Sequence, residues 1–255
     1  MKRIEQTPTV IAEARNLSVS TPDGEPILRN VSISVKRGDR LLVVGPSGAG
    51  KTTLLNALIG NVQPEQVTSG SVELFGQSLY GQPTPRRHLR MLSRTPDGVL
   101  SAKDRDRMLR NHVGIYLQRP DLNDSWTVHQ NLEEAAQVSD RRFGEGLDAL
   151  EVARRLGIDH ILEHETGQKS GGQKQRIALG ALLVPKPELL VLDEPTSALS
   201  ESDRHQALGA LVDVCDTYGM TAIMISHDDE ANGFATHTLT MRNGMVLESP
   251  QTQAS

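Results

Sequence analysis

The chain has 255 residues, a net charge of −5, 37% apolar, 23% charged and only 3% aromatic residues. This composition is typical of one globular unit with a large core, and the negative charge and scarce aromatics argue against nucleic acid or anionic lipid as a partner. The single cysteine, Cys215, excludes an internal disulfide, and no apolar run is long enough to span a bilayer. The first residues carry charge without an apolar stretch behind them, so we expect no secretory signal and a cytoplasmic location without direct membrane insertion.

The first predicted element is an antiparallel hairpin. Residues 14–35 alternate between apolar and polar side chains on both sides of Thr21-Pro22-Asp23-Gly24, which is a strong turn signal.

A phosphate-binding motif follows. The apolar strand at residues 40–44 leads into Gly-Pro-Ser-Gly-Ala-Gly-Lys-Thr, and the next residues have the apolar spacing of a helix. Glycines let successive backbone N–H groups point at one anion, and the helix N-terminus adds partial positive charge. Lys51 would reach the β- and γ-phosphates, and Thr52 would offer its hydroxyl to Mg²⁺. A chance glycine-rich turn is the alternative, but the flanking strand and helix disfavour it. The predicted nucleotide-binding residues here are Gly45, Pro46, Ser47, Gly48, Ala49, Gly50, Lys51, Thr52 and Thr53.

The composition and the apolar pattern change twice in the middle of the chain. Residues 82–111 are rich in arginine and proline and are best interpreted as a solvated loop with a charged helix. A strand at residues 112–118 ends in Gln118, and the pattern then turns helical to residue 170. Thr127 with Gln130 fits a capping box that opens one of these helices.

Two further segments carry polar residues at the ends of elements. Ser170, Gly171, Gly172 and Gln173 precede a helical run. The apolar run Leu189–Asp193 is typical of a central parallel strand, whose carboxyl end is where open α/β sheets bind ligands. Asp193 could hold Mg²⁺ and Glu194 could polarise an attacking water.

The last third of the chain adds a histidine and a second hairpin. His227 follows an apolar strand at residues 223–226, although a lone histidine is more often a packed or solvated one. Cys215 lies on a helical apolar stripe, which predicts burial. Asn243-Gly244 between two short apolar runs predicts a terminal hairpin.

Taken in order, these segments resemble the ATPase subunits of ABC transporters, most closely the lipoprotein-release and macrolide-export types. The resemblance rests on the glycine-rich loop, Gln118, the Ser170 segment, the Asp193-Glu194 strand end and His227, and it covers nearly the whole chain.

The resemblance implies a mechanism. Two ATPase units would pair head to tail, and the segment Ser170, Gly171, Gly172 and Gln173 would cap the ATP held by the opposite loop. Gln118 would contact Mg²⁺ and report nucleotide state to a transmembrane permease subunit. Glu194 and His227 would act on the water and the γ-phosphate, and Thr52, Gln118 and Asp193 would be the metal ligands.

Three departures from the family pattern stand out. Lys169 replaces the leucine that usually opens the Ser170 segment. Ser200 stands where an aspartate usually couples the two sites, and with Asp203 it fits a helix start instead. No aromatic residue precedes Phe75, so the usual stacking partner of adenine is missing.

The predicted fold is therefore α/β, a P-loop ATPase with a mostly parallel core sheet, an antiparallel β subdomain and an inserted helical subdomain. We expect one domain over residues 1–255, with the core in 1–117 and 171–255 and the helical subdomain in 118–170. The expected partners are permease subunits and a second ATPase subunit, identical or related, on the inner face of the membrane. The coupling surface would lie near residues 118–131, where Trp126 could equally be a core residue. The alternatives are an ABC-type ATPase without a transport role and a nucleotide-gated adaptor with little turnover.

Overall fold

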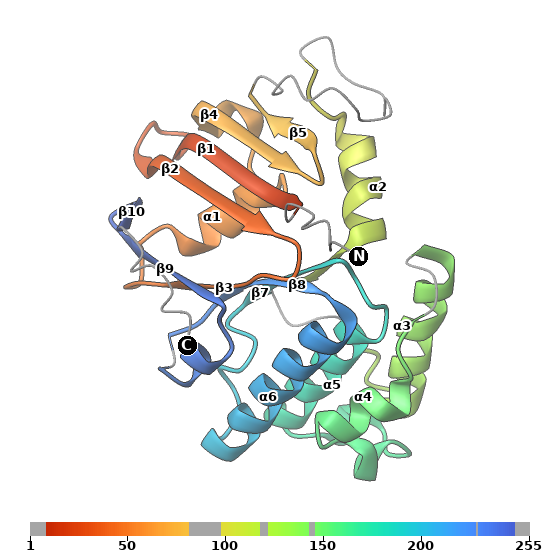
Figure 1. Cartoon of the computed structure of the whole chain (residues 1–255). Helices are drawn as coiled ribbons and strands as arrows, with labels where there is room; N and C mark the ends of the chain where they lie inside the picture. Colours follow the sequence, from red (N-terminus) through yellow and green to blue (C-terminus); the bar gives the residue numbers. More distant parts are fainter. Residues whose placement is uncertain (1–8, 82–97, 118–121, 143–145, 228, 248–255) are drawn as a thin grey trace, which may run out of the picture. The chain divides into compact units, whose positions relative to one another are not determined.

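The computed structural model describes residues 9–81, 98–117, 122–142, 146–227 and 229–247, which form two compact units. The first, here called the β unit, contains the described residues 9–39, 45–81, 98–106 and 239–247. The second, the α/β unit, contains residues 40–44, 107–117, 122–142, 146–227 and 229–238. Figure 1 shows the elements of both units.

An antiparallel sheet makes up most of the β unit. Its strands lie in the order β2-β1-β4-β5, and adjacent strands run antiparallel. The strands are β1 (Val10–Ser20), β2 (Pro26–Lys36), β4 (Val67–Leu74) and β5 (Gln77–Tyr80). Strand β2 alternates buried and exposed residues, as expected for a sheet with one covered face. The predicted hairpin is confirmed, and its turn is closed by the Thr21 amide, which donates to Glu25 O at 2.8 Å.

Helix α1 (Lys51–Leu58) and the 3₁₀ helix η1 (Pro64–Gln66) also belong to the β unit. The predicted terminal hairpin is present as β9 (His237–Arg242) and β10 (Met245–Leu247). Asn243 and Gly244 both have positive φ, at 51° and 76°, as a two-residue type I′ turn requires.

A parallel sheet forms the centre of the α/β unit. Strands β3 (Arg40–Val44), β8 (Thr221–Ile225), β7 (Leu189–Asp193) and β6 (Val113–Tyr116) are hydrogen-bonded in that order, all parallel. Every residue of β8 is buried, which explains why these strands read as unbroken apolar runs. Helix α2 (Ala102–His112) precedes β6 and is the charged helix expected in that region, while residues 82–97 lie outside the described residues.

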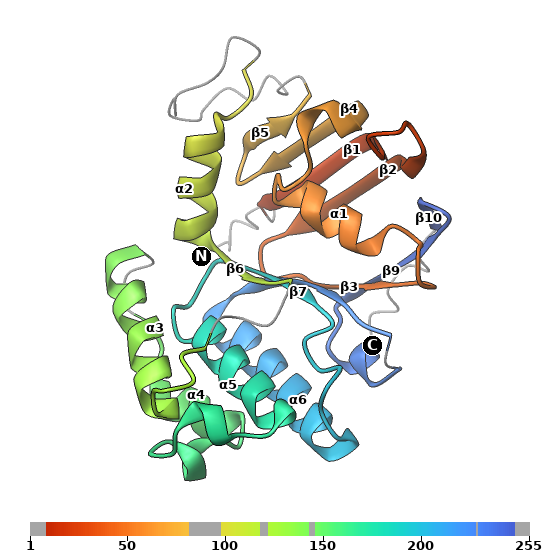
Figure 2. The same cartoon turned by 180° about the vertical axis from the view of Figure 1, so that it is seen from behind.

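Helices α5 (Gly171–Leu183) and α6 (Glu201–Tyr218) lie side by side against one face of this sheet (Figures 1 and 2). Helices α3 (Val128–Arg142) and α4 (Ala149–Arg155) pack beside α5, and Leu132, Leu156 and Ile177 meet in the shared core. The unit also has the 3₁₀ helices η2 (Asp159–Ile161), η3 (Thr166–Gln168) and η4 (Asp229–Gly233). None of the helices in the described part of the chain has the length and apolar character to cross a membrane.

Helices α3 and α6 begin at the capping residues that the sequence predicted. The Thr127 hydroxyl accepts from the Gln130 amide at 3.1 Å, and the Gln130 side chain accepts from the Thr127 amide at 2.9 Å, so the predicted capping box is present. Ser200 caps α6 by accepting from the Asp203 amide. Cys215 is buried, as its apolar stripe predicted.

Candidate functional site

The glycine-rich loop after β3 has a backbone conformation that favours glycine. Gly45, Gly48 and Gly50 have φ values of 147°, 76° and 92°. At Gly45 a Cβ atom would lie 2.2 Å from Met241 O, and at Gly50 it would lie 2.9 Å from Leu28 Cδ2. The β9–β10 turn also holds the loop, because the Gly244 amide donates to Ala49 O at 3.1 Å. The sequence indicated this turn but gave no signal that it supports the loop.

Lys51 lies inside this loop at the start of α1. Its side chain is buried, and Nζ donates to Gly45 O at 2.8 Å and to Pro46 O at 3.0 Å. No acidic residue lies in the first turn of α1, and Thr52 beside Lys51 is exposed. An ammonium, the amides of a helix start and a hydroxyl are thus gathered in one place, which is a donor set suited to a phosphate anion.

A second polar cluster lies at the carboxyl ends of β7 and β8. His227 Nε2 is 3.0 Å from Glu194 Oε1, and both side chains are partly exposed. A cavity of about 110 Å³ is lined by this pair together with Thr196, Ser197 and Ser226. These last three residues were missed by sequence reasoning, since short hydroxyl side chains beside a strand end have no distinguishing pattern.

Glu194 has an unusual backbone for its residue type. Its φ is 49°, in the left-handed region, and its amide donates to Ile225 O at 3.0 Å. A non-glycine residue in this region costs free energy and is often found where a side chain must be directed at a reacting group. Asp193, the last residue of β7, is half-buried next to it.

The Ser170 segment opens α5 with a full capping box. Ser170 Oγ accepts from the Gln173 amide at 3.2 Å, and Gln173 Oε1 accepts from the Ser170 amide at 3.0 Å. Ser170 and Gly171 are exposed, and a Cβ at Gly171 would meet nothing within 4 Å. Lys169, the departure from the family pattern, has its Nζ 2.9 Å from His164 Nδ1. The structure therefore presents this helix start at the surface of the α/β unit.

The structure thus brings Asp193, Glu194 and His227 together within the α/β unit, while the loop residues 45–53 form their own cradle in the β unit. Gln118 lies outside the described residues.

A glycine cradle around a buried lysine, placed between a parallel strand and a helix, defines the P-loop class of nucleotide hydrolases. The family model described as ABC transporter matches residues 28–197. The chain therefore belongs to the ABC transporter family, within which it is an ATP-binding and ATP-hydrolysing subunit that powers transport.

Individual relatives agree with this assignment. The lipoprotein-releasing system ATP-binding protein LolD of Psychrobacter arcticus is 30% identical over 92% of this chain and 97% of its own length. The macrolide export ATP-binding/permease protein MacB of Shigella flexneri is 28% identical over 95% of this chain and 35% of its own length. The dimeric ATP-binding cassette MJ0796, solved in a post-hydrolysis state with ADP and Pi, shares the fold, with a TM-score of 0.74, 21% identity and coverage of 96% of this chain and 100% of its own. The predicted family and fold class are confirmed.

Proposed function

We propose that this chain binds ATP through its P-loop residues and that Glu194, His227 and Gln118 act in its hydrolysis. Residues Gly45 to Thr53 would bind the phosphates, with the Lys51 ammonium turning from the carbonyls of Gly45 and Pro46 to the β- and γ-phosphates. Thr52 and Asp193 offer hard oxygen donors of the kind that Mg²⁺ prefers, and Gln118 is the third proposed ligand. Magnesium, when bound, supplies charge neutralisation at the phosphates.

The contact between His227 and Glu194 is the observation that carries the proposed hydrolytic role. Glu194 can accept a hydrogen bond from a water molecule and increase its nucleophilicity, and the strained backbone at φ 49° fixes the direction of the carboxylate. His227 Nε2, 3.0 Å away, holds that carboxylate, and its side chain is partly exposed. We assign the catalytic roles to Glu194, His227 and Gln118.

A second ATPase subunit would complete the site. Helix α5 has 13 residues, and Ser170 and Gly171 are exposed at its start, so this helix N-terminus could meet the γ-phosphate held by another copy. Gly172 and Gln173 would complete the segment. We propose a head-to-tail homodimer, with a heterodimer as the other arrangement. Residues 118–170 would act as the helical subdomain of a single ATPase domain.

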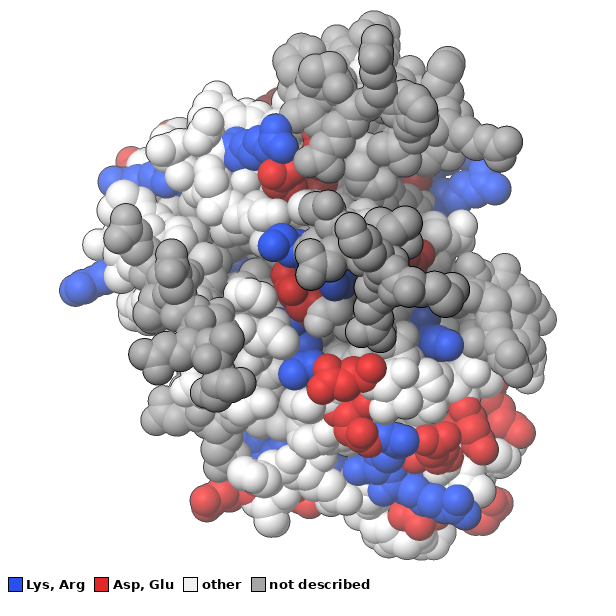
Figure 3. Space-filling model, in the orientation of Figure 1, with Lys and Arg blue, Asp and Glu red and all other residues white. Residues whose placement is uncertain are grey.

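The proposed membrane partner is a permease subunit that binds near residues 118–131, which places the chain at the cytoplasmic face of the membrane. Trp126 has 37% of its surface exposed, which favours partner contact over a role in the core, whereas Leu122 is half-buried against the core. On the face shown in Figure 3, the described acidic and basic side chains are intermixed over the lower part, which supports a protein partner rather than nucleic acid.

The relatives narrow the kind of transporter. Because LolD serves a lipoprotein-releasing system and MacB is a macrolide export protein, we propose an export-type or lipoprotein-release-type transporter for this chain.

The decisive test replaces Lys51 with alanine and measures ATP binding and steady-state ATPase rate. We expect both to fall by about 100-fold or more, since the phosphates lose their nearest fixed counter-charge. Lys103→Ala, on the exposed side of α2, is the matched control and should behave like the parent chain. Near-normal turnover in Lys51→Ala would remove the P-loop from the mechanism.

A further inference from the structure

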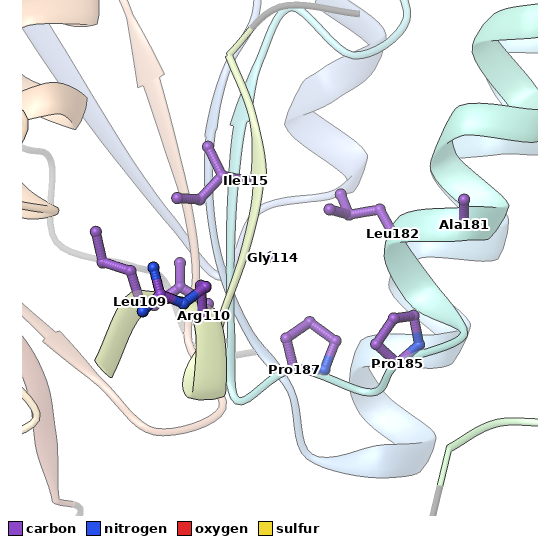
Figure 4. A pocket seen from close by; sticks show the side chains of 9 residues that line it. Leu109, Arg110, Gly114, Ile115, Ala181, Leu182, Pro185 and Pro187 are labelled. Carbon is purple, nitrogen blue, oxygen red and sulfur yellow. The ribbon is translucent and has the colours of Figure 1, made fainter. Parts of the chain in front are cut away.

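An apolar cavity of about 280 Å³ runs along β6 in the α/β unit, and it shares no lining residue with the cavity at the Glu194 cluster. Residues 113–115 of β6 form its floor, and we call it the β6 groove. Leu109 and Arg110 line it from the end of α2, and Leu182, Pro185 and Pro187 line it from α5 and the loop before β7. Figure 4 shows these two sets of side chains on either side of the strand.

The strand at the floor of this groove is the outermost one of the parallel sheet among the described residues. Directly after β7, the Glu194 amide donates to Ile225 O at the end of β8, so the even-numbered residues of β7 direct their backbone groups toward β8. Glu188, just before the strand, bridges both neighbours, because its carbonyl accepts from Thr221 N and its amide donates to His112 O. The odd-numbered residues of β7 therefore direct their N–H and C=O groups toward β6. In the observed register they reach His112, Gly114 and Tyr116.

It follows that Val113 and Ile115 direct their backbone N–H and C=O groups away from β7, toward the open edge. These polar groups lie between apolar walls. An apolar molecule in the groove would leave them without hydrogen bonds, which is costly, whereas an extended peptide would pair with them. Natural proteins usually cover or block such an edge because it invites association.

The charge at the rim of the groove indicates which side chains a partner peptide would need. Arg110 is exposed and lines the groove, and its guanidinium makes no hydrogen bond or ion pair with the described residues. The neighbouring ionic groups are already engaged: His112 Nδ1 lies 2.7 Å from Glu188 Oε1, and Lys186 lies over the Tyr218 ring. Arg110 is thus available to a carboxylate.

We propose that the β6 groove docks an extended segment of a partner polypeptide, in which apolar residues alternate with acidic ones. The segment adds a strand to β6, its backbone pairs with Val113 and Ile115, its apolar side chains fill the cavity, and an acidic side chain pairs with Arg110. Gln118, the proposed reporter of nucleotide state, comes two residues after the end of β6 in the sequence, so a peptide bound in the groove is positioned to influence it. The proposal does not depend on ATP binding.

The test uses the full chain without nucleotide and a capped seven-residue peptide of alternating valine and glutamate. Binding is followed by amide chemical shifts, which we expect to change at Val113, Ile115 and the end of α2 and to saturate. Arg110→Glu should weaken binding roughly tenfold, and a peptide with lysine in place of glutamate should prefer that variant. Ala181→Phe, which fills the groove from α5, should abolish binding.

Two controls separate strand pairing from other kinds of contact. Arg154→Glu, at an exposed position of α4, changes the net charge by the same amount and should leave the affinity unchanged. A peptide N-methylated at alternate residues cannot pair along an edge and should not bind. Thermal melting checks that each variant folds.

Several outcomes would overturn the proposal. One is the absence of saturable binding at millimolar peptide. Another is that the N-methylated peptide binds as tightly as the unmethylated one. A third is that Arg154→Glu weakens peptide binding as much as Arg110→Glu does. If decanoate displaces the peptide and binds with the same affinity as the peptide, the groove is a site for small apolar carboxylates and not for a peptide strand. Dimerisation of the chain that is lost in Arg110→Glu would show that a second copy occupies the groove.

Discussion

His227 Nε2 lies 3.0 Å from Glu194 Oε1 and joins the ends of two adjacent parallel strands, β8 and β7. The backbone contributes to this arrangement, because the Glu194 amide donates to Ile225 O and keeps Glu194 in its left-handed conformation. The carboxylate is thereby held at the carboxyl ends of the parallel strands, where open α/β sheets bind their ligands.

Glu194→Gln keeps the size and hydrogen-bonding capacity of this side chain but removes its negative charge. We expect ATP binding to persist and turnover to fall by about 100-fold or more. The variant should accumulate as an ATP-held dimer, measured by light scattering at saturating ATP. Glu201→Gln, in the exposed first turn of α6, is the control. A monomer under these conditions would count against a homodimer and leave a heterodimer open.

Two glycines of the P-loop should differ in their tolerance of alanine. Gly48 has φ 76° and open space around a Cβ, so Gly48→Ala should cost about 1–2 kcal/mol. At Gly45 the Cβ would also collide with Met241 O at 2.2 Å, so Gly45→Ala should cost at least about 3 kcal/mol. Urea unfolding measures both values. Equal costs would show that Met241 moves aside freely.

The buried Cys215 thiol should be unreactive. Burial raises its pKa from about 9 to about 12, while nearby Arg40 lowers it and Asp216 raises it. The stability due to the neutral buried thiol is fully present below about pH 9 and is lost as pH rises through 12. A disulfide reagent at pH 8 should react at least about 100-fold more slowly with the native chain than in urea. Fast modification without unfolding would contradict this burial.

GTP should compete well with ATP. No aromatic residue precedes Phe75, so base stacking worth about 1–3 kcal/mol is missing and binding rests mainly on the phosphates. Competition against a fluorescent ATP analogue should give inhibition constants for GTP and ATP within about tenfold of each other. A strong preference for ATP would mean that another group contacts the base.

Trp126 should contribute to recruitment by a membrane partner. Its backbone is fixed, since Trp126 N donates to Asn123 O at 3.1 Å and Trp126 O accepts from Thr166 N at 2.8 Å, while the side chain stays exposed. Trp126→Ala should weaken pelleting with membranes that contain the permease, and Leu122→Ala should do the same, with ATP binding unchanged. Leu150→Ala, 38% exposed on α4, is the matched control. The parent chain alone should not float with liposomes, and binding there would contradict a protein-mediated contact.

The sequence by itself determined the features that depend on local chemistry. The P-loop spacing, the capping box at Thr127, the helix cap at Ser200 and the Asn243-Gly244 turn each follow from a few neighbouring residues. The apolar run at β7 likewise required a buried parallel strand.

Only the tertiary structure decided what lies beside these segments. The close approach of Met241 to Gly45, the pairing of Glu194 with His227 and the β6 groove all join residues distant in sequence. Strand order and register bring such residues together, and neither is encoded in a short pattern, because parallel strands are connected through long crossovers. The exposure of Trp126 was undecided for the same reason: an aromatic residue on a turn is buried or exposed according to what packs over it.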